Sequence, residues 1–508
     1  MRPYLTGLAA TFALLWASAA QAETSPPPSS EAPSTSGAEA TSASAAEATS
    51  ASGTEATSAS GTEAPPSNEQ LLEELRQSRQ ELNDGLERIQ GQVDTIDERI
   101  DALEGENEQE EDVYEPGPGI VLARGRLGEA TLGLRGYFRY LNDTGLDHTY
   151  TDAFGRTKEL DLRQDFQLNR LQILTRGWLF DPRLRWSFYV WTQNVSMGDE
   201  QQVVVGGNMT YAFDEALNVQ VGIFSIPSTR STTQSFPNWL RIDHRTMADE
   251  YFRGSYSEGI LAFGTIARGV SYSASLTNNL SILGVSASEL DNDLSTVSLA
   301  LWWMPTTGEY GPAAGFGDYE YHERLASLVG VRFTRSREDA QGQPSVNDFE
   351  NAQLRLSDGT LLFSPDPFGT GGSLQDARYQ MLALDGGLKY RGWSLDGEYY
   401  FRWLDEFGLA QGTIPVTDLY DHGFQLQAST MLQRERLQAY LSGSQIYGEF
   451  GDPWDVAAGL TYFPMGSKEV RLNVQSLYTE RSAVGYTAIP YQVGGTGWTF
   501  TIDFGIWF

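Results

Sequence analysis

The sequence has 508 residues, with 67 acidic and 35 basic side chains, no cysteine, 52 glycines and 12% aromatic residues. A net charge of −32 lacks the basic excess of nucleic-acid-binding proteins, so nucleic acid is excluded as a partner. Without cysteine the chain can form neither disulfides nor cysteine-ligated metal sites. No apolar run of about 18 residues follows the N-terminal segment, so we expect no membrane-spanning helix.

Residues 1–22 have the features of a secretory signal peptide. Arg2 supplies a positive start, residues 5–20 are apolar and small, and Ala-Gln-Ala at 20–22 matches the A-x-A cleavage pattern. We therefore expect export, with Glu23 as the first mature residue.

Residues 23–68 form a loose eight-residue repeat of alanine, serine, threonine, glycine and glutamate. The repeated acids fall at Glu39, Glu47, Glu55 and Glu63. So little apolar area cannot offset the entropy cost of ordering the chain. We expect a disordered tether.

Residues 69–104 carry a heptad pattern of apolar residues. One core position takes Leu86, Val93 and Ile100, and the other takes Leu82, Ile89, Ile96 and Leu103. Branched residues at both positions favour three strands over two. We expect a coiled coil that assembles a homotrimer, followed by an acidic linker at 105–130.

The remaining residues, 131–508, have the pattern of β-strands. At the C-terminus, aromatic and aliphatic residues alternate with polar ones over residues 497–508, a length that suits a tilted membrane strand. Sixteen such segments follow one another, at 131–141, 166–179, 183–195, 203–213, 217–227, 258–267, 270–278, 294–304, 325–335, 379–390, 393–404, 422–433, 436–447, 454–464, 468–479 and 497–508.

Short turns and long polar loops alternate between these segments, and both ends lie on the short-turn side. That layout predicts an all-β fold, a transmembrane antiparallel β-barrel of about 16 strands, with a water-filled lumen. Fourteen or eighteen strands remain open. The segment 166–179 changes face near Arg170, and the connection 305–324 is long for a short-turn side.

No motif predicts an enzyme, a cofactor or a metal. The four histidines are His148, His244, His322 and His422. His322 is followed by glutamate, as in H-E-x-x-H, but Ala326 occupies the second histidine position. We expect no catalysis.

Arginines are the candidate pore-lining residues. Strand alternation turns six of them toward the lumen, namely Arg135, Arg139, Arg170, Arg176, Arg185 and Arg402. The long connection 228–257 adds Arg230, Arg241, Arg245 and Arg253, and its length suits a constriction loop folded into the pore. Arginines there would favour anions. Alternatively, the acids of the same loop, Asp243, Asp249, Glu250 and Glu258, hold these arginines in structural salt bridges.

Two other functions stay open. Inward aromatic residues could form a track for sugars, at Tyr137, Tyr189, Trp191, Phe224, Tyr400 and Trp507. A plugged barrel could instead link the outer membrane to the cell wall, with peptidoglycan as a partner.

The region 168–278 resembles the phosphate-selective porin (O/P-type) family. The matching residues are Asn169-Arg170-Leu171, the run Leu179-Phe180-Asp181-Pro182-Arg183-Leu184, the run Leu217-Asn218-Val219-Gln220-Val221-Gly222, Pro227 and Glu258-Gly259-Ile260. The resemblance implies a trimeric outer-membrane channel. It also implies pore lysines, yet residues 119–508 have only Lys158, Lys389 and Lys468 against 27 arginines, so phosphate specificity is not predicted.

Together these features predict a passive porin in the outer membrane of a Gram-negative bacterium. Its partners would be two further copies of itself, membrane lipid and small hydrophilic solutes, with a mild preference for anions. The coiled coil would lie in the periplasm.

Overall fold

The computed structural model describes residues 68–107, 119–193, 202–233, 239–242, 244–283, 285, 293–343, 352–486 and 488–508. The chain divides into two units, Met1–Gln109 and Glu110–Phe508. The predicted signal peptide and the predicted spacer, except Asn68, lie outside the described residues.

In the first unit, α2 runs from Asn68 to Asn107. Its stripe of heptad residues is between 43% and 66% exposed in the single chain, from Leu72 to Val93. The side chains of the later heptad residues, Ile96, Ile100 and Leu103, lie outside the described set. None of the helices in the described part of the chain has the length and hydrophobicity of a membrane span.

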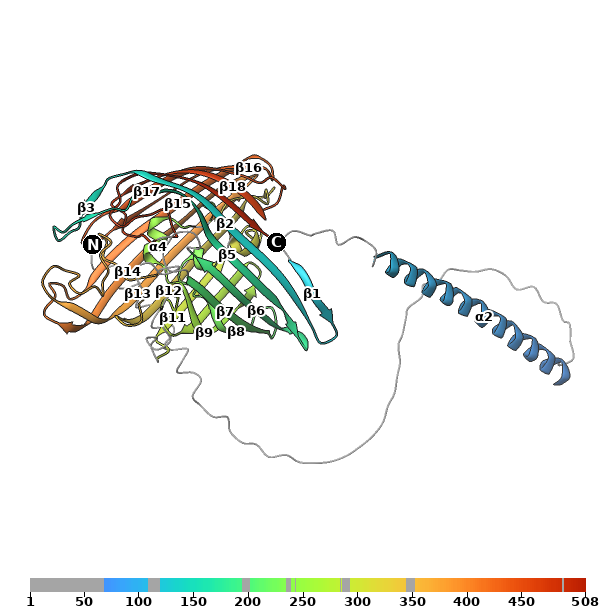
Figure 1. Ribbon diagram of the computed structural model, residues 1–508. Coiled ribbons are helices and arrows are strands. Elements are labelled where there is room, and N and C mark those ends of the chain that lie inside the picture. The colour runs from blue at the N-terminus through green and yellow to red at the C-terminus, as the bar shows by residue number, and fades with distance from the viewer. Residues whose placement is uncertain are drawn as a thin grey trace, which may run out of the picture. The chain divides into compact units, whose positions relative to one another are not determined.

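The second unit is a closed antiparallel barrel of sixteen strands, visible in Figure 1. Its strands are β2 (Gly128–Leu146), β5 (Gln164–Leu179), β6 (Asp181–Gln193), β7 (Gln202–Ala212), β8 (Asn218–Ser225), β9 (Tyr256–Ala267), β10 (Val270–Thr277), β11 (Thr296–Trp303), β12 (Ala326–Asp339), β13 (Ser373–Tyr390), β14 (Trp393–Gln411), β15 (Leu419–Gln433), β16 (Leu437–Tyr447), β17 (Trp454–Tyr462), β18 (Val470–Glu480) and β19 (Gly497–Trp507). Each strand pairs with its neighbour in sequence, and β19 pairs with β2 to close the ring. The predicted fold class is confirmed, and β13 and β14 extend beyond their predicted ends to Ser373 and Gln411.

An additional strand, β1 (Ile120–Gly125), lies in the segment predicted to be linker. It pairs with the first residues of β2, which β19 does not reach. Phe508 pairs with β2 between the segments that pair with β1 and β19, because Leu134 and Phe508 exchange two backbone hydrogen bonds of 3.0 Å.

The barrel is polar inside and apolar outside. In β19, Phe500, Ile502 and Phe504 are exposed on the outer face, while Thr501 and Asp503 are buried on the inner face. This reverses the pattern of a soluble sandwich and is typical of barrels that contact lipid.

The predicted change of face near Arg170 is a β-bulge. The register between β2 and β5 shifts where Tyr137 pairs with Arg170 and Phe138 pairs with Leu168, so that two residues of β2 face the three residues 168–170 of β5. An extra residue on one strand reverses which side chains point inward beyond it.

Several connections add structure of their own. The loop after β2 holds a small hairpin of β3 (Thr149–Thr151) and β4 (Thr157–Glu159). The constriction loop, defined as residues 226–255, contains α3 (Arg230–Thr233) and α4 (Met247–Phe252). The short-turn connection, defined as residues 304–325, contains the 3-10 helix Pro312–Ala314.

Candidate functional site

The constriction loop lies inside the barrel against the wall formed by β13–β17. Figure 1 shows α4 within the ring of strands. The backbone N–H of Ala248 donates to Ser444 Oγ at 2.9 Å, and the Thr246 hydroxyl donates to Gln425 at 3.0 Å. The ring of Phe252 stacks on Tyr400 with centroids 5.1 Å apart. The loop is therefore fixed by both polar and apolar contacts with one side of the lumen.

Arg230 joins the constriction loop to that wall and to the short-turn connection. Its guanidinium pairs with Asp396 of β14 at 2.8 Å, and both side chains are fully buried. Its Nη2 donates to the carbonyl of Ala314 at 3.0 Å. Burial lowers the pKa of Arg230, but Asp396, together with Tyr310 and Asp385, outweighs it and raises that pKa. The arginine stays charged and holds three segments together.

Four further candidate arginines are also buried in ion pairs. Neither these four nor Arg230 lines the larger cavity that is described below. The pairs are Arg241–Asp455 at 2.8 Å, Arg253–Glu250 at 2.6 Å, Arg139–Asp503 at 2.7 Å and Arg402–Asp421. Three of the four carboxylates project from barrel strands rather than from the loop. A buried charge is tolerated only with such a partner, so each of these arginines has a structural role.

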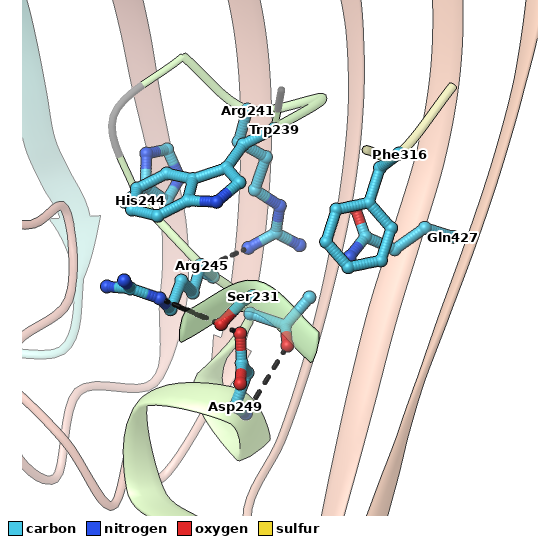
Figure 2. A pocket seen from close by; sticks show the side chains of 9 residues that line it. Ser231, Trp239, Arg241, His244, Arg245, Asp249, Phe316 and Gln427 are labelled. Atoms are coloured by element: carbon cyan, nitrogen blue, oxygen red, sulfur yellow. Dashed lines mark hydrogen bonds and ion pairs between the residues drawn. The ribbon is translucent and has the colours of Figure 1, made fainter. Parts of the chain in front are cut away.

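Arg245 lies between a small cavity and a larger one. Figure 2 shows the small cavity, about 10 Å³, with Trp239, Arg245 and Asp249 on its wall. Arg245 lies over the Trp239 ring at 4.1 Å and pairs with Glu250 at 3.3 Å. Burial is the largest effect on Asp249 and raises the pKa of its carboxyl. A void this small has room for about one water, not for a solute.

The larger cavity has a volume of about 430 Å³ and lies along β2 and β5–β11. Three arginines line it, Arg135, Arg170 and Arg245. Seven aromatic residues also line it: Tyr189, Trp191, Phe224, Trp239, Tyr256, Phe263 and Trp302. Among the described residues, no aspartate or glutamate belongs to its wall. It is therefore a positively charged space with an aromatic lining.

The remaining two candidate arginines, Arg176 and Arg185, project inward from the same wall as Arg135 without lining the cavity. Arg176 pairs across strands with Ser187, two residues from Arg185. Both side chains are exposed. The ten predicted arginines thus separate into two groups, with Arg245 at the boundary.

The predicted aromatic track is interrupted. Tyr189, Trp191 and Phe224 line the larger cavity. Tyr137, Tyr400 and Trp507 are buried on the inner face with exposures of 4%, 0% and 6% and do not line it. Packing against neighbouring side chains, such as Phe252 on Tyr400, removes them from the path of a solute. Strand alternation in the sequence could also have predicted Trp302, Phe263 and Asn208 as lining residues of this cavity, since all three lie on predicted strands.

In the described part of the chain, one group has the spacing of metal ligands, Asp318, Glu320 and His322 of the short-turn connection. His322 Nδ1 contacts Asp318, and its Nε2 lies 3.1 Å from Glu309. Glu320 pairs with Lys468. The hydrogen bond to Asp318 is the largest effect on His322 and raises its pKa. These contacts already engage both ring nitrogens of His322 and an oxygen of each of the two carboxylates, so the group links parts of this connection to each other and to Lys468, and we call it the clasp.

No family model and no curated protein matches the chain, so the resemblance to phosphate-selective porins stays a prediction. Solved structures do align. An anion-selective porin from Comamonas acidovorans has a TM-score of 0.45 and 12% identity, over 75% of this chain and 99% of that chain. OmpT of Vibrio cholerae has a TM-score of 0.45 and 11% identity, over 76% and 99%. The channel DcaP of Acinetobacter baumannii has a TM-score of 0.45 and 9% identity, over 77% and 100%. These likenesses are distant, so the function proposed below rests on this chain's own lumen.

Proposed function

We propose that this chain is an outer-membrane diffusion channel that passes small hydrophilic solutes and prefers anions. The observation that carries the proposal is the unequal filling of the barrel. One side of the lumen is packed with loops, whereas the other keeps a cavity of about 430 Å³ lined by three arginines and by no described carboxylate. Passive diffusion through it requires no cofactor, metal or covalent step.

The outer surface supports a membrane location. The outward residues of β19 and its neighbours are large and apolar, and the inward residues are polar. A closed barrel satisfies all backbone hydrogen bonds without an edge strand, as lipid requires. Together with the predicted signal peptide, this supports the outer membrane of a Gram-negative bacterium.

The exposed heptad stripe of α2 supports assembly. Leu82, Leu86 and Ile89 are each more than half exposed in the single chain. Burying such a stripe between copies would stabilise a coiled coil, and its branched residues favour three strands. We propose a homotrimer with the helix in the periplasm.

Phosphate specificity has less support. Lys158 lies in the hairpin of β3 and β4, Lys389 is buried, and Lys468 pairs with Glu320. None of the three lines the larger cavity. General anion selectivity through arginine is the function that these positions favour.

The test is conductance of the purified protein in a planar bilayer, with the reversal potential measured under a potassium chloride gradient. The proposal predicts steps in groups of three and a reversal potential that favours chloride. A cation-selective pore would contradict the anion preference.

The packed half of the lumen favours a second candidate, a plugged structural barrel. The constriction loop and the short-turn connection meet at Arg230 inside the barrel. Folded protein without any conductance in the same bilayer experiment would support this candidate, and peptidoglycan binding would then be the next measurement.

A further inference from the structure

The wall of the larger cavity is divided into a cationic side and an aromatic side. Arg135 and Arg170 project from β2 and β5. Tyr189 and Trp191 project from β6, and the half-buried Phe263 and Trp302 from β9 and β11. Such a wall offers one kind of contact to a charge and another to a flat apolar surface.

The two arginines are close enough to share one anion. Arg135 pairs with Gln172 across the sheet, and Arg170 lies two residues from Gln172 on the same strand. Diagonal neighbours of this kind are about 7–8 Å apart, so their side chains reach a common point. Arg135 also donates to Gln172 Oε1 at 3.4 Å, which turns its guanidinium along the wall. Two cations facing one cavity repel each other, and an anion between them relieves that repulsion.

The aromatic side is held in place before any solute arrives. Tyr189 and Trp191 stack with centroids 5.0 Å apart and 13° between ring planes. Trp191 meets Tyr256 edge to face at 5.3 Å. Trp302 lies under the guanidinium of Arg332 at 5.7 Å, and Arg332 is itself fixed by Asp385 at 3.2 Å. Rigid rings bind an apolar surface at a low cost in side-chain entropy.

We propose that the cavity is a binding site for organic anions that carry a flat apolar ring, such as aryl carboxylates. This inference rests on the proposed channel function and narrows its solute class. The carboxylate would accept hydrogen bonds from Arg135 and Arg170, and the ring would contact the aromatic side. The volume of about 430 Å³ falls in the usual range of small-molecule sites. An inorganic anion would contact the cationic side alone, and a neutral sugar carries no charge to pair with the two arginines.

The test compares benzoate, acetate and benzyl alcohol as blockers of the bilayer current carried by the full-length protein. We expect benzoate to block at a concentration at least about tenfold lower than either comparison compound, because each of those lacks one of the two contacts. Calorimetric titration of benzoate into the detergent-solubilised protein measures binding without requiring conduction.

Variants test separately the contact of the carboxylate with the arginines and the contact of the ring with the aromatic side. Arg135→Gln and Arg170→Gln should each weaken benzoate binding about tenfold, the usual cost of losing a charge-assisted hydrogen bond. Trp302→Leu should weaken benzoate binding severalfold and leave acetate unchanged. Arg185→Gln removes an inward arginine of the same wall that does not line the cavity, and it should leave benzoate binding unchanged.

The outcomes separate this inference from the channel function. If benzoate and acetate block equally while chloride selectivity is present, the aryl-anion site is refuted and the channel remains. If benzoate binds through Arg135 but the folded protein does not conduct, the site remains and the channel is refuted. Equal loss of binding in Arg185→Gln would also overturn the site.

Discussion

The two halves of the lumen use the same residue, arginine, for different purposes. In the filled half, lined by β12–β19, inward carboxylates such as Asp396 and Asp455 face arginines of the constriction loop and neutralise them. In the open half, lined by β2 and β5–β11, the cavity has arginines and no described carboxylate. An inward arginine therefore indicates anion selectivity only where no carboxylate of the facing wall pairs with it.

The difference has an energetic basis. A charge taken out of water is costly, and a buried ion pair recovers that cost only with good geometry and further hydrogen bonds. Arg241 meets these conditions, since it contacts Asp455, Ser442 and Tyr491. Arginines beside a water-filled space remain hydrated and can act on passing ions.

The largest effect is expected from breaking a pair in the filled half. Asp396→Ala leaves Arg230 fully buried without its carboxylate, so we expect a loss of about 3–5 kcal/mol in the free energy of unfolding. Urea unfolding of the protein in detergent or lipid vesicles measures it. Asp181→Asn, in an exposed ion pair with Arg183, serves as the control and should leave stability nearly unchanged. A loss as small as that of the control would show that Arg230 is not a structural link.

Charge reversal in the open half should change selectivity rather than stability. At about 7 Å and an effective dielectric constant of about 20, one charge contributes about 2 kcal/mol to an ion beside it. The double variant of Arg135→Glu and Arg170→Glu should therefore turn a chloride-preferring pore into a potassium-preferring one. The reversal potential under a salt gradient measures this change. Unchanged chloride preference would place the ion path elsewhere.

Arg245, at the boundary, should contribute less than Arg135. It shares a buried cluster with Asp249 and Glu250. Burial raises the pKa of Asp249 and Arg245 lowers it, so removal of Arg245 shifts Asp249 toward its neutral form and offsets part of the lost positive charge. We expect Arg245→Gln to change the chloride-to-potassium permeability ratio less than twofold, roughly the effect of a screened charge, and less than Arg135→Gln does. An equal or larger change would mean that the loop sets selectivity.

The smallest effect is expected at the clasp of the short-turn connection. The hydrogen bond to Asp318 raises the pKa of His322 above its usual 6.5. Protonated His322 therefore stabilises the clasp fully below pH 6.5, and this stabilisation is lost as the pH rises through the raised pKa. Burial raises the pKa of Asp318, but hydrogen bonds from His322 and from the backbone of Gly392 outweigh it and lower that pKa, so the stabilising contribution of this carboxylate is lost only in acid. We expect trypsin cleavage at the exposed Arg324, relative to cleavage at Arg183, to rise from about pH 6 to about pH 9. In His322→Gln this ratio should stay constant with pH, and a parallel rise in both proteins would contradict the clasp.

The strand order could be predicted from the sequence because alternation is a local property. Phe500, Ile502 and Phe504 identify their strand without any knowledge of the rest of the chain. Even the bulge at Asn169 was visible as a change of face. The strand Ile120–Gly125 could not be predicted, since it is short, follows the sequence Pro-Gly-Pro and is defined by its pairing with β2.

The division of the arginines could not be predicted, because it depends on distant partners. Arg139 and Asp503 are 364 positions apart and meet only when β19 pairs with β2. The sequence showed the acids near Arg245 on the loop itself, but not that Asp455 would meet Arg241. It likewise could not show that residues 304–325 fold back to contact Arg230.

Cysteine accessibility tests the central claim, that solutes pass along the open half only. The chain has no cysteine, so single substitutions give an unambiguous signal. Asn208→Cys places a thiol on the wall of the larger cavity, and Ala457→Cys places one on the inward face of the filled half, where Ala457 is fully buried. The account predicts that a negatively charged methanethiosulfonate reagent reduces the bilayer current of Asn208→Cys and leaves that of Ala457→Cys unchanged. Modification and current loss in Ala457→Cys, with Asn208→Cys unaffected, would contradict it.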